Sequence, residues 1–488
     1  MTKLERHFKK YRKNIVGLTE RYNSPYGKQK LLYADWVASG RLYKPIEEKL
    51  LKTVGPFVAN THTEANVTGS TMTAAYEFAK QIIKKHVNAD PESDVIITDG
   101  SGMTSVVNKL QRILGLRLPE KYKQRIFLKE ENRPIVFVTH MEHHSNHTSW
   151  LETIADVVVV EPDKHNAISL SNLRQTLERY KHRKLKIGAF TACSNVTGIK
   201  TPYHKMAKIM HEHGGYCFVD FACSAPYVRI NMKPQHEAEH LDGIYFSPHK
   251  FLGGPGTSGV LIFNKHLYKN KIPDHSGGGT VNWTNPWGGK SYYDDIEKRE
   301  DGGTPGFLQV MKTALCIKLK EEMGIENISR REKEILTIAF NELASIKGLH
   351  ILQGNIRERL GIISFYIEGI HYNLMTKLLS DRYGIQVRGG CACAGTYGHY
   401  LLGISKVQSK IISNQIDQGD VSKKPGWVRL SLHPTMKNAE VYYITNAIKE
   451  IVLNINDWKK DYCYDNIKNE FFHKKFNDTQ DVKKWFAH

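Results

Sequence analysis

The sequence has no long apolar run, and this absence excludes a membrane-spanning helix. No stretch approaches the ~20 consecutive apolar residues that such a helix needs. The amino-terminal residues 1–14 also have no apolar core of the kind found in signal peptides. We therefore expect no membrane partner and a cytoplasmic location.

Cysteine is scarce as well, with seven residues in a chain of 488. This density is far below that of a disulfide-stabilised scaffold, so we expect reduced thiols.

Clustered basic charge is also missing. The formal net charge is +19, yet no Lys/Arg run reaches five residues, which is typical of a solvated surface. Nucleic acid is therefore not expected as a partner, although the net charge keeps an RNA-binding protein as a rival interpretation.

Short apolar, β-branched segments recur between residues 94 and 263. They do not alternate between polar and apolar residues, so both faces of each strand are predicted to be buried. The segments are 94–98, 134–139, 156–162, 187–194, 215–221, 243–249 and 259–263. Helical patterns begin between them at Ser169 and at Thr201, where Thr201 is expected to cap and Pro202 to occupy the first turn. The alternation predicts an α/β fold with a seven-stranded, mainly parallel sheet.

The pattern changes after about residue 305 and predicts a smaller carboxy-terminal α/β domain. Two helices are expected, followed by three strands; their ranges are 306–323, 328–346, 361–369, 384–390 and 427–432. The polar segment 406–426 is expected to be a turn-rich surface excursion. The predicted division is an N-terminal helical segment (1–30), a large domain (31–305), a small domain (306–456) and a basic, aromatic tail (457–488).

Lys250 and Asp220 carry the clearest chemical signals. Lys250 lies in SPHKFLGGPG, between two apolar strands, where burial of an amine is costly and favours a lowered pKa and a Schiff base. Asp220 ends the apolar segment FVDF, where a buried carboxylate needs a cationic partner. The protonated ring nitrogen of a pyridine cofactor would supply that cation. A structural lysine and a helix-capping aspartate are the alternative interpretations.

Two further segments follow predicted strands at the same edge of the sheet, where ligands gather in such folds. In DGSGMTSVVNKL, Gly, Ser and Thr residues open a helix whose N–H groups suit a phosphate. In HMEHHSNHTSW, His143 is a candidate to cover a cofactor ring and move a proton. The histidines of this run are also possible metal ligands, but no metal is expected because no set of cysteines or carboxylates accompanies them.

These motifs together resemble the class V aminotransferase fold of pyridoxal 5′-phosphate (PLP) enzymes. Within that fold they are most similar to the SufS-like cysteine desulfurases, with molybdenum cofactor sulfurases as near relatives. The matching segments cover about residues 30–455 in unbroken order. They are LLYADWVASGR, ANTHTEA, SGMTSVVN, MEHHSN, TACSNVTG, VDFACSAP, SPHKFLGGPGTSGVL, GGGTV, DGGTPG, VRGGCACAG and VRLSL.

The resemblance implies a fold type I PLP-dependent enzyme and a role for each matching residue. Lys250 would form the Schiff base, Asp220 would pair with the pyridinium and His143 would stack on the ring. Arg429 would grip the substrate carboxylate through a bidentate pair; a surface strand arginine is the alternative. The other implied contacts to cofactor or substrate are Asn195, Cys223, Ser247, His249, Gly102, Met103 and Thr104. Thr304 would reach the phosphate of a partner subunit, which implies a homodimer with shared active sites.

Cys393 determines the reaction that the resemblance implies. The arrangement of Arg388, Gly390 and Cys393 resembles the loop that carries the nucleophilic cysteine of desulfurases. The expected reaction converts L-cysteine to L-alanine and leaves sulfur as a persulfide for a sulfur-acceptor protein. Cys391 and Ala392 stand where the SufS-like loop commonly has two histidines, so Cys391 is an alternative sulfur carrier. Cys223 likewise replaces the usual glutamine.

Two other functions stay open at this point. One is a different class V PLP reaction, as in an aminotransferase, an epimerase or a selenocysteine or cysteine lyase. The other is a scaffold or nucleic-acid-binding protein that has the fold but no catalysis. The sequence does not name the sulfur acceptor.

Overall fold

The structure is a computed structural model that describes residues 1–123, 125–477 and 482–487. Within these residues the chain forms two compact units. Unit 1 comprises Met1–Trp36 and Arg330–His488, and unit 2 comprises Val37–Ser329. The division into the four segments 1–30, 31–305, 306–456 and 457–488 stays a prediction. Among the described residues, no helix is long and apolar enough to cross a membrane.

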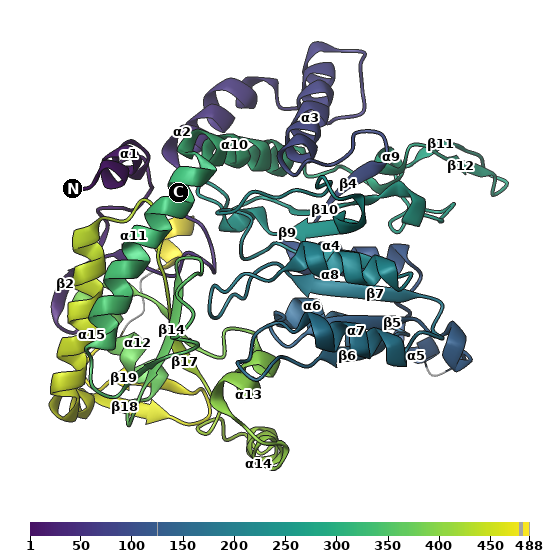
Figure 1. Cartoon of the computed structure of the whole chain (residues 1–488). Coiled ribbons are helices and arrows are strands. Elements are labelled where there is room, and N and C mark those ends of the chain that lie inside the picture. The colour runs from purple at the N-terminus through teal and green to yellow at the C-terminus, as the bar shows by residue number, and fades with distance from the viewer. Residues whose placement is uncertain (124, 478–481, 488) are drawn as a thin grey trace. The chain divides into compact units, whose positions relative to one another are not determined.

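Unit 2 is built around a seven-stranded sheet, as predicted (Figure 1). Its strands are β4 (Asp94–Asp99), β5 (Ile135–Thr139), β6 (Asp156–Val160), β7 (Lys186–Thr191), β8 (Tyr216–Asp220), β9 (Gly243–Phe246) and β10 (Gly259–Asn264). They lie in the order β4-β10-β9-β8-β7-β5-β6, and only β10 runs antiparallel to its neighbours. The prediction of a mainly parallel sheet with both faces buried is confirmed.

Helices of unit 2 pack against this sheet and against one another. They are α2 (Lys44–Lys49), α3 (Val67–His86), α4 (Met103–Ile113), α5 (Glu120–Lys123), α6 (His144–Leu151), α7 (Leu170–Arg179), α8 (Tyr203–Glu212), α9 (Ile296–Glu300) and α10 (Phe307–Met323). A small hairpin, β11 (Val281–Thr284) with β12 (Lys290–Tyr292), completes the unit. Helix α8 begins without the predicted cap, because the Thr201 hydroxyl donates to the carbonyl of Thr191 instead.

The parallel strands place their carboxyl ends at one edge of the sheet. Thr191 pairs with Asp220 and Asp220 pairs with Tyr245, so β7, β8 and β9 end level with one another. Strand β4 also ends at this edge, because two antiparallel pairings through β10 make it parallel to β9. The segments that follow β4, β5, β7, β8 and β9 therefore share one edge.

Unit 1 has a four-stranded antiparallel sheet in the order β13-β14-β17-β16. Its strands and helices are α1 (Lys3–Arg12), β1 (Arg21–Ser24), β2 (Gly27–Lys30), β3 (Leu32–Tyr33), α11 (Ile325–Ala344, in unit 1 from Arg330), β13 (Leu349–Ile351), β14 (Ile362–Ile367), α12 (Tyr372–Tyr383), β15 (Ile385–Gln386), β16 (Arg388–Gly390), α13 (Gly395–Leu402), α14 (Lys406–Asp417), β17 (Trp427–Ser431), α15 (Asn438–Trp458), β18 (Tyr462–Asp465) and β19 (Glu470–His473). The amino-terminal strand β3 pairs with β15, which lies more than 350 residues later.

Two segments of unit 1 contain regular structure that the sequence analysis did not predict. The surface excursion contains the helix α14, which begins with a capping box formed by Ser405 and Gln408. The tail contains a hairpin, because β18 pairs with β19 in antiparallel register. Both segments are largely exposed, so polarity alone did not indicate their backbone structure.

A buried ion-pair cluster ties helix α4 to the chain that returns after β10. Lys109 Nζ lies 2.8 Å from Glu300 Oε2 and 3.5 Å from Asp274 Oδ2, and all three side chains are buried. Arg112 adds a bidentate contact to Asp274. Buried charges cost several kcal/mol when they lose their partners, so this cluster fixes α4 in place.

We expect the substitution Lys109→Met to lower the free energy of unfolding by about 3–5 kcal/mol, because it leaves buried carboxylates without their cation. Lys318→Met is the matched control. Lys318 pairs with Glu321 on the surface, and its loss should change stability by about 0.5 kcal/mol or less. Denaturant unfolding of both variants measures the difference; equal losses would contradict the role of the buried cluster.

Candidate functional site

The sequence-predicted residues fall into two groups, one in each unit, and each group is described on its own. Asp220 and Lys250 lead the group at the carboxyl edge of the unit 2 sheet. Asp220 is the last residue of β8 and only 4% exposed. Lys250 is half-buried and ends a short 3₁₀ helix, Pro248–Lys250, that follows β9.

Lys250 follows β9, which pairs with β8 beside Asp220, and its positive charge acts on the Asp220 carboxyl group. Burial raises the pKa of Asp220 to about 6, while a hydrogen bond from the Ala222 N–H and the positive charge of Lys250 act in the opposite direction. The Ala222 N–H donates to Oδ1 at 2.8 Å. A buried carboxyl group with this pKa would be stabilised as the anion by a further cation.

The turn at Gly102, Met103 and Thr104, which was predicted to bind a phosphate and is called the phosphate-type turn below, lies at the same edge. Gly102 precedes α4, and the N–H of Met103 donates to Ser247 Oγ at 2.8 Å. His249 Nδ1 donates to the carbonyl of Ser101 at 2.9 Å. A Cβ on Gly102 would lie 3.0 Å from the His249 ring and 3.1 Å from Ser247 Oγ, so a larger residue would push these side chains back by a few tenths of an ångström.

His143 caps helix α6 beside this turn. Its Nδ1 accepts the N–H of Ser145 at 3.1 Å, so the proton of the neutral ring lies on Nε2. Ser145 Oγ in turn lies 2.7 Å from Thr104 Oγ1, which connects the amino termini of α6 and α4. The structure therefore brings His143 and the phosphate-type turn together.

Asn195 and Cys223 follow β7 and β8 and are both buried. The thiol of Cys223 donates to the carbonyl of Ser194 at 3.7 Å. Thr304, in contrast, is exposed, in a segment where the N–H of Gly303 donates to the carbonyl of Gly278. Its predicted contact is with a partner subunit, so its role stays a prediction.

Sequence reasoning missed Glu142, which is fully buried next to His143. Its carboxylate accepts hydrogen bonds from the N–H groups of Thr139 and Thr191 and from the Asn146 side chain. Burial raises the pKa of Glu142 to about 8, with the hydrogen bonds acting against it and the charge of Asp220 adding to it. The sequence could have indicated Glu142, because an acidic residue just after a buried strand needs hydrogen-bond donors from the protein.

The unit 1 group is centred on Asp35, which sequence reasoning also missed. Arg429, on β17, is 3% exposed, and its Nη2 donates to Asp35 Oδ1 at 2.8 Å. The half-exposed Arg388 donates through Nε to Asp35 Oδ2 at 3.0 Å. The carboxylate orients both guanidinium groups. Asp35 is the aspartate of the segment LLYADWVASGR, so the sequence contained it as a candidate.

The loop with the predicted nucleophile is a tight turn after β16. Ala392 and Cys393 both have positive φ angles, +50° and +56°, and the Ala394 N–H donates to the carbonyl of Cys391 at 3.1 Å. Such φ values cost about 1–2 kcal/mol for each L-residue other than glycine. Cys393 is exposed and Cys391 is half-buried. Of the two thiols, Cys393 is the more accessible to a substrate.

The family model for aminotransferase class V matches residues 32–444 of this chain. The chain belongs to the class V aminotransferase family. A probable cysteine desulfurase of Halalkalibacterium halodurans is 28% identical over 369 residues, which are 75% of this chain and 84% of the relative. One of Staphylococcus epidermidis is 29% identical over 371 residues, with the same coverage.

Solved structures share the fold of this class V family member. The apo structure of a cysteine desulfurase from Thermococcus onnurineus NA1 has a TM-score of 0.72 at 23% identity, over 91% of this chain and 98% of that one. The cysteine desulfurase CsdA from Escherichia coli has a TM-score of 0.69 at 21% identity, with the same coverage. The predicted family and fold are both confirmed.

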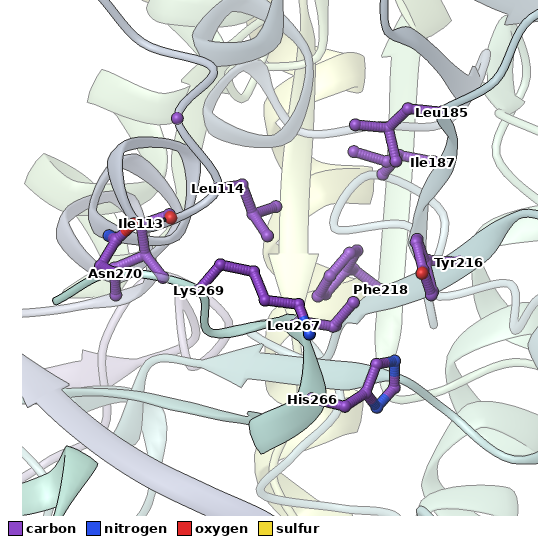
Figure 2. Close-up of a pocket in the computed structure, with 11 residues that line it drawn as sticks. Ile113, Leu114, Leu185, Ile187, Tyr216, Phe218, His266, Leu267, Lys269 and Asn270 are labelled. Atoms are coloured by element: carbon purple, nitrogen blue, oxygen red, sulfur yellow. Dashed lines mark hydrogen bonds between the residues drawn. The ribbon is translucent and has the colours of Figure 1, made fainter. Parts of the chain in front are cut away.

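A separate pocket lies at the opposite edge of the same sheet (Figure 2). Its volume is about 290 Å³, and it is lined near the start of β7 and β8 by Leu185, Ile187, Tyr216 and Phe218. Figure 2 shows Lys269 reaching across it from the segment after β10. None of the predicted site residues lines this pocket, so we assign it no part in the chemistry of this family member.

The raised pKa of Asp220 predicts that the free energy of unfolding depends on pH. The prediction applies to protein treated with hydroxylamine, which removes any bound aldehyde. Because the pKa rises from 3.8 to about 6 on folding, the folded protein keeps a proton that the unfolded chain releases. Stability should therefore fall by about 3 kcal/mol as pH rises from about 4 to about 6. Asp220→Asn should remove this fall. Denaturant unfolding across pH tests it; parallel profiles for the two proteins would refute it.

Proposed function

We propose that this chain is a PLP-dependent cysteine desulfurase that converts L-cysteine to L-alanine and retains the sulfur on Cys393. The observation that carries the proposal is the convergence of Asp220 and Lys250 at the edge where β8 and β9 end. The desulfurases among its relatives and the exposed thiol of Cys393 support the choice of reaction.

The residues at the unit 2 edge fit PLP. A buried acid whose pKa burial raises to about 6 is suited to a pyridinium, which would supply the missing cation. Ser247, His249 and the amino terminus of α4 would hold the phosphate, and Lys250 would bond to the aldehyde. Asn195 and Cys223 would contact the cofactor. When bound, PLP supplies an electron sink that stabilises negative charge at the substrate Cα.

The protein's own groups would position the substrate and move its protons. Arg429 would bind the cysteine carboxylate, while Asp35 holds its guanidinium in place. The half-buried Lys250 amine would act as the base that removes the substrate Cα proton. His143, whose Nδ1 accepts a hydrogen bond and whose Nε2 carries the proton, would act as a proton donor.

Cys393 would accept the sulfur. Its thiolate attacks the substrate Sγ, so that a new S–S bond forms as the Cβ–Sγ bond breaks. The balance is L-cysteine plus the Cys393 thiol giving L-alanine plus the Cys393 persulfide. A reductant or a sulfur-acceptor protein then removes the outer sulfur. We further propose a cytoplasmic homodimer in which Thr304 reaches the phosphate of the partner subunit.

The reaction predicts different effects for the two loop cysteines. Cys393→Ala should lower sulfide and alanine release from L-cysteine in the presence of dithiothreitol by at least 100-fold, because the sulfur has no acceptor. Cys391→Ala, the matched control, should stay within about threefold of wild type. Both products are measured by methylene blue formation and amino-acid analysis. Normal turnover of Cys393→Ala would exclude this mechanism.

Cofactor attachment can be tested without turnover. The purified protein should be yellow, and borohydride should fix the phosphopyridoxyl group on the peptide that contains Lys250. Mass spectrometry of a digest identifies the position. Lys250→Ala should give no labelled peptide, and a label at another lysine in the wild type would contradict the assignment.

A further inference from the structure

His211, His240 and Asp242 form a cluster at the sheet edge opposite the candidate site. His211 lies in the last turn of α8, while His240 and Asp242 lie directly before β9. One ligand atom from each residue lies within 4.8 Å of the other two. We propose that these three side chains bind one divalent transition-metal ion, with Zn²⁺ as the expected ligand.

The spacing of the ligand atoms suits a tetrahedral ion. His240 Nε2 lies 3.6 Å from Asp242 Oδ1, and His211 Nε2 lies 2.9 Å from Asp242 Oδ2. Ligands at the usual 2.0–2.1 Å from Zn²⁺ in a tetrahedron are about 3.4 Å apart. Only a small widening between His211 and Asp242 is needed to admit the ion.

The Nδ1 atom of each of the two histidines contacts a backbone carbonyl, as is usual for histidines that bind a metal through Nε2. His211 Nδ1 lies 2.7 Å from the carbonyl of Ala238, and His240 Nδ1 lies 2.7 Å from the carbonyl of Glu237. A carbonyl only accepts, so each Nδ1 carries a proton, and the Nε2 atom of each ring faces the carboxylate. This carbonyl contact is the arrangement that fixes the tautomer of zinc-bound histidines.

Without an ion, the same contacts need additional protons on the two rings. A carboxylate also only accepts, so its contact with His211 Nε2 requires a second proton on that ring. His240 faces the same choice, and the two rings stack with centroids 4.1 Å apart. Two imidazolium rings at that distance repel each other, whereas one cation shared by both Nε2 atoms satisfies every group.

Asp242 is prepared as a charged ligand. It is 2% exposed, and its Oδ2 also accepts the N–H of Cys217 at 2.7 Å. Lys233, whose charge acts on His240, is paired with Asp94 at 3.4 Å.

The local backbone explains which histidine takes part. His236 and His240 have the HExxH spacing that binds zinc when it lies on a helix. Here Glu237–Glu239 form only one 3₁₀ turn, and His240 joins His211 and Asp242 instead. His240 is partly exposed, which leaves a coordination position for water. The ion would fasten this turn to the end of α8 and, at an edge remote from Lys250, would serve stability.

The test uses the full, tag-free chain after EDTA treatment and removal of the chelator. Zn²⁺ titration against a competing chromophoric chelator should give one tight site in the wild type. His211→Gln and His240→Gln should each weaken that site at least tenfold. His236→Gln is the matched control and should bind as the wild type does. Circular dichroism of the metal-free variants checks that each is folded.

Two further measurements separate this site from the thiols. Co²⁺ should give visible bands of a tetrahedral ion without thiolate charge transfer, and Cys391→Ala/Cys393→Ala should give the same spectrum. Zn²⁺ should raise the melting temperature of the wild type and of His236→Gln but not of His240→Gln. The proposal is overturned if tight binding survives both His211→Gln and His240→Gln, if it requires the loop cysteines, or if no tight site is found. None of these outcomes bears on desulfurase activity.

Discussion

The in-register pairing of β7, β8 and β9 is the constraint on which the candidate site of unit 2 depends. Because Thr191, Asp220 and Tyr245 lie side by side, the segments after these strands begin at one level. Residues that are distant in the sequence therefore reach a common edge, where hydrogen bonds such as that from the Met103 N–H to Ser247 Oγ form between them. The antiparallel strand β10 extends the same edge to the turn before α4.

Two buried acids show how their partners determine what a carboxylate can do. Asp35 in unit 1 is in direct contact with two guanidinium groups, so its charge is neutralised by the protein itself. Asp220 in unit 2 has one amide hydrogen bond and the field of a nearby lysine, and its pKa stays raised. Asp35 is thus suited to orienting arginines, whereas Asp220 is suited to a cation that arrives with a ligand.

Much of unit 2 could be predicted because buried parallel strands have a strong apolar signal. The strand ends then identified Asp220, Lys250 and the turn at Gly102. Glu142 and Asp35 were missed because their roles come from contacts that form only on folding, with Thr191 in one case and Arg429 in the other. Both residues lie inside segments that resemble the family, Glu142 in MEHHSN and Asp35 in LLYADWVASGR.

Local signals failed where short-range polar contacts compete. Helix α14 depends on the capping box of Ser405 and Gln408 within a segment of low hydrophobicity. Thr201 had the sequence of a helix cap, yet its hydroxyl satisfies a buried carbonyl of β7 instead. The pairing of β3 with β15 has no local signal at all, because its partners are far apart in the chain.

That last pairing has a consequence for synthesis on the ribosome. Leu32 cannot meet Ile385 until almost four fifths of the chain has been translated, whereas every strand of the seven-stranded sheet has been translated by Asn264. Unit 2 is therefore free to fold first, as amino-terminal domains commonly do. Strand β3, within the first 36 residues, must wait for β15 and the other strands that complete unit 1.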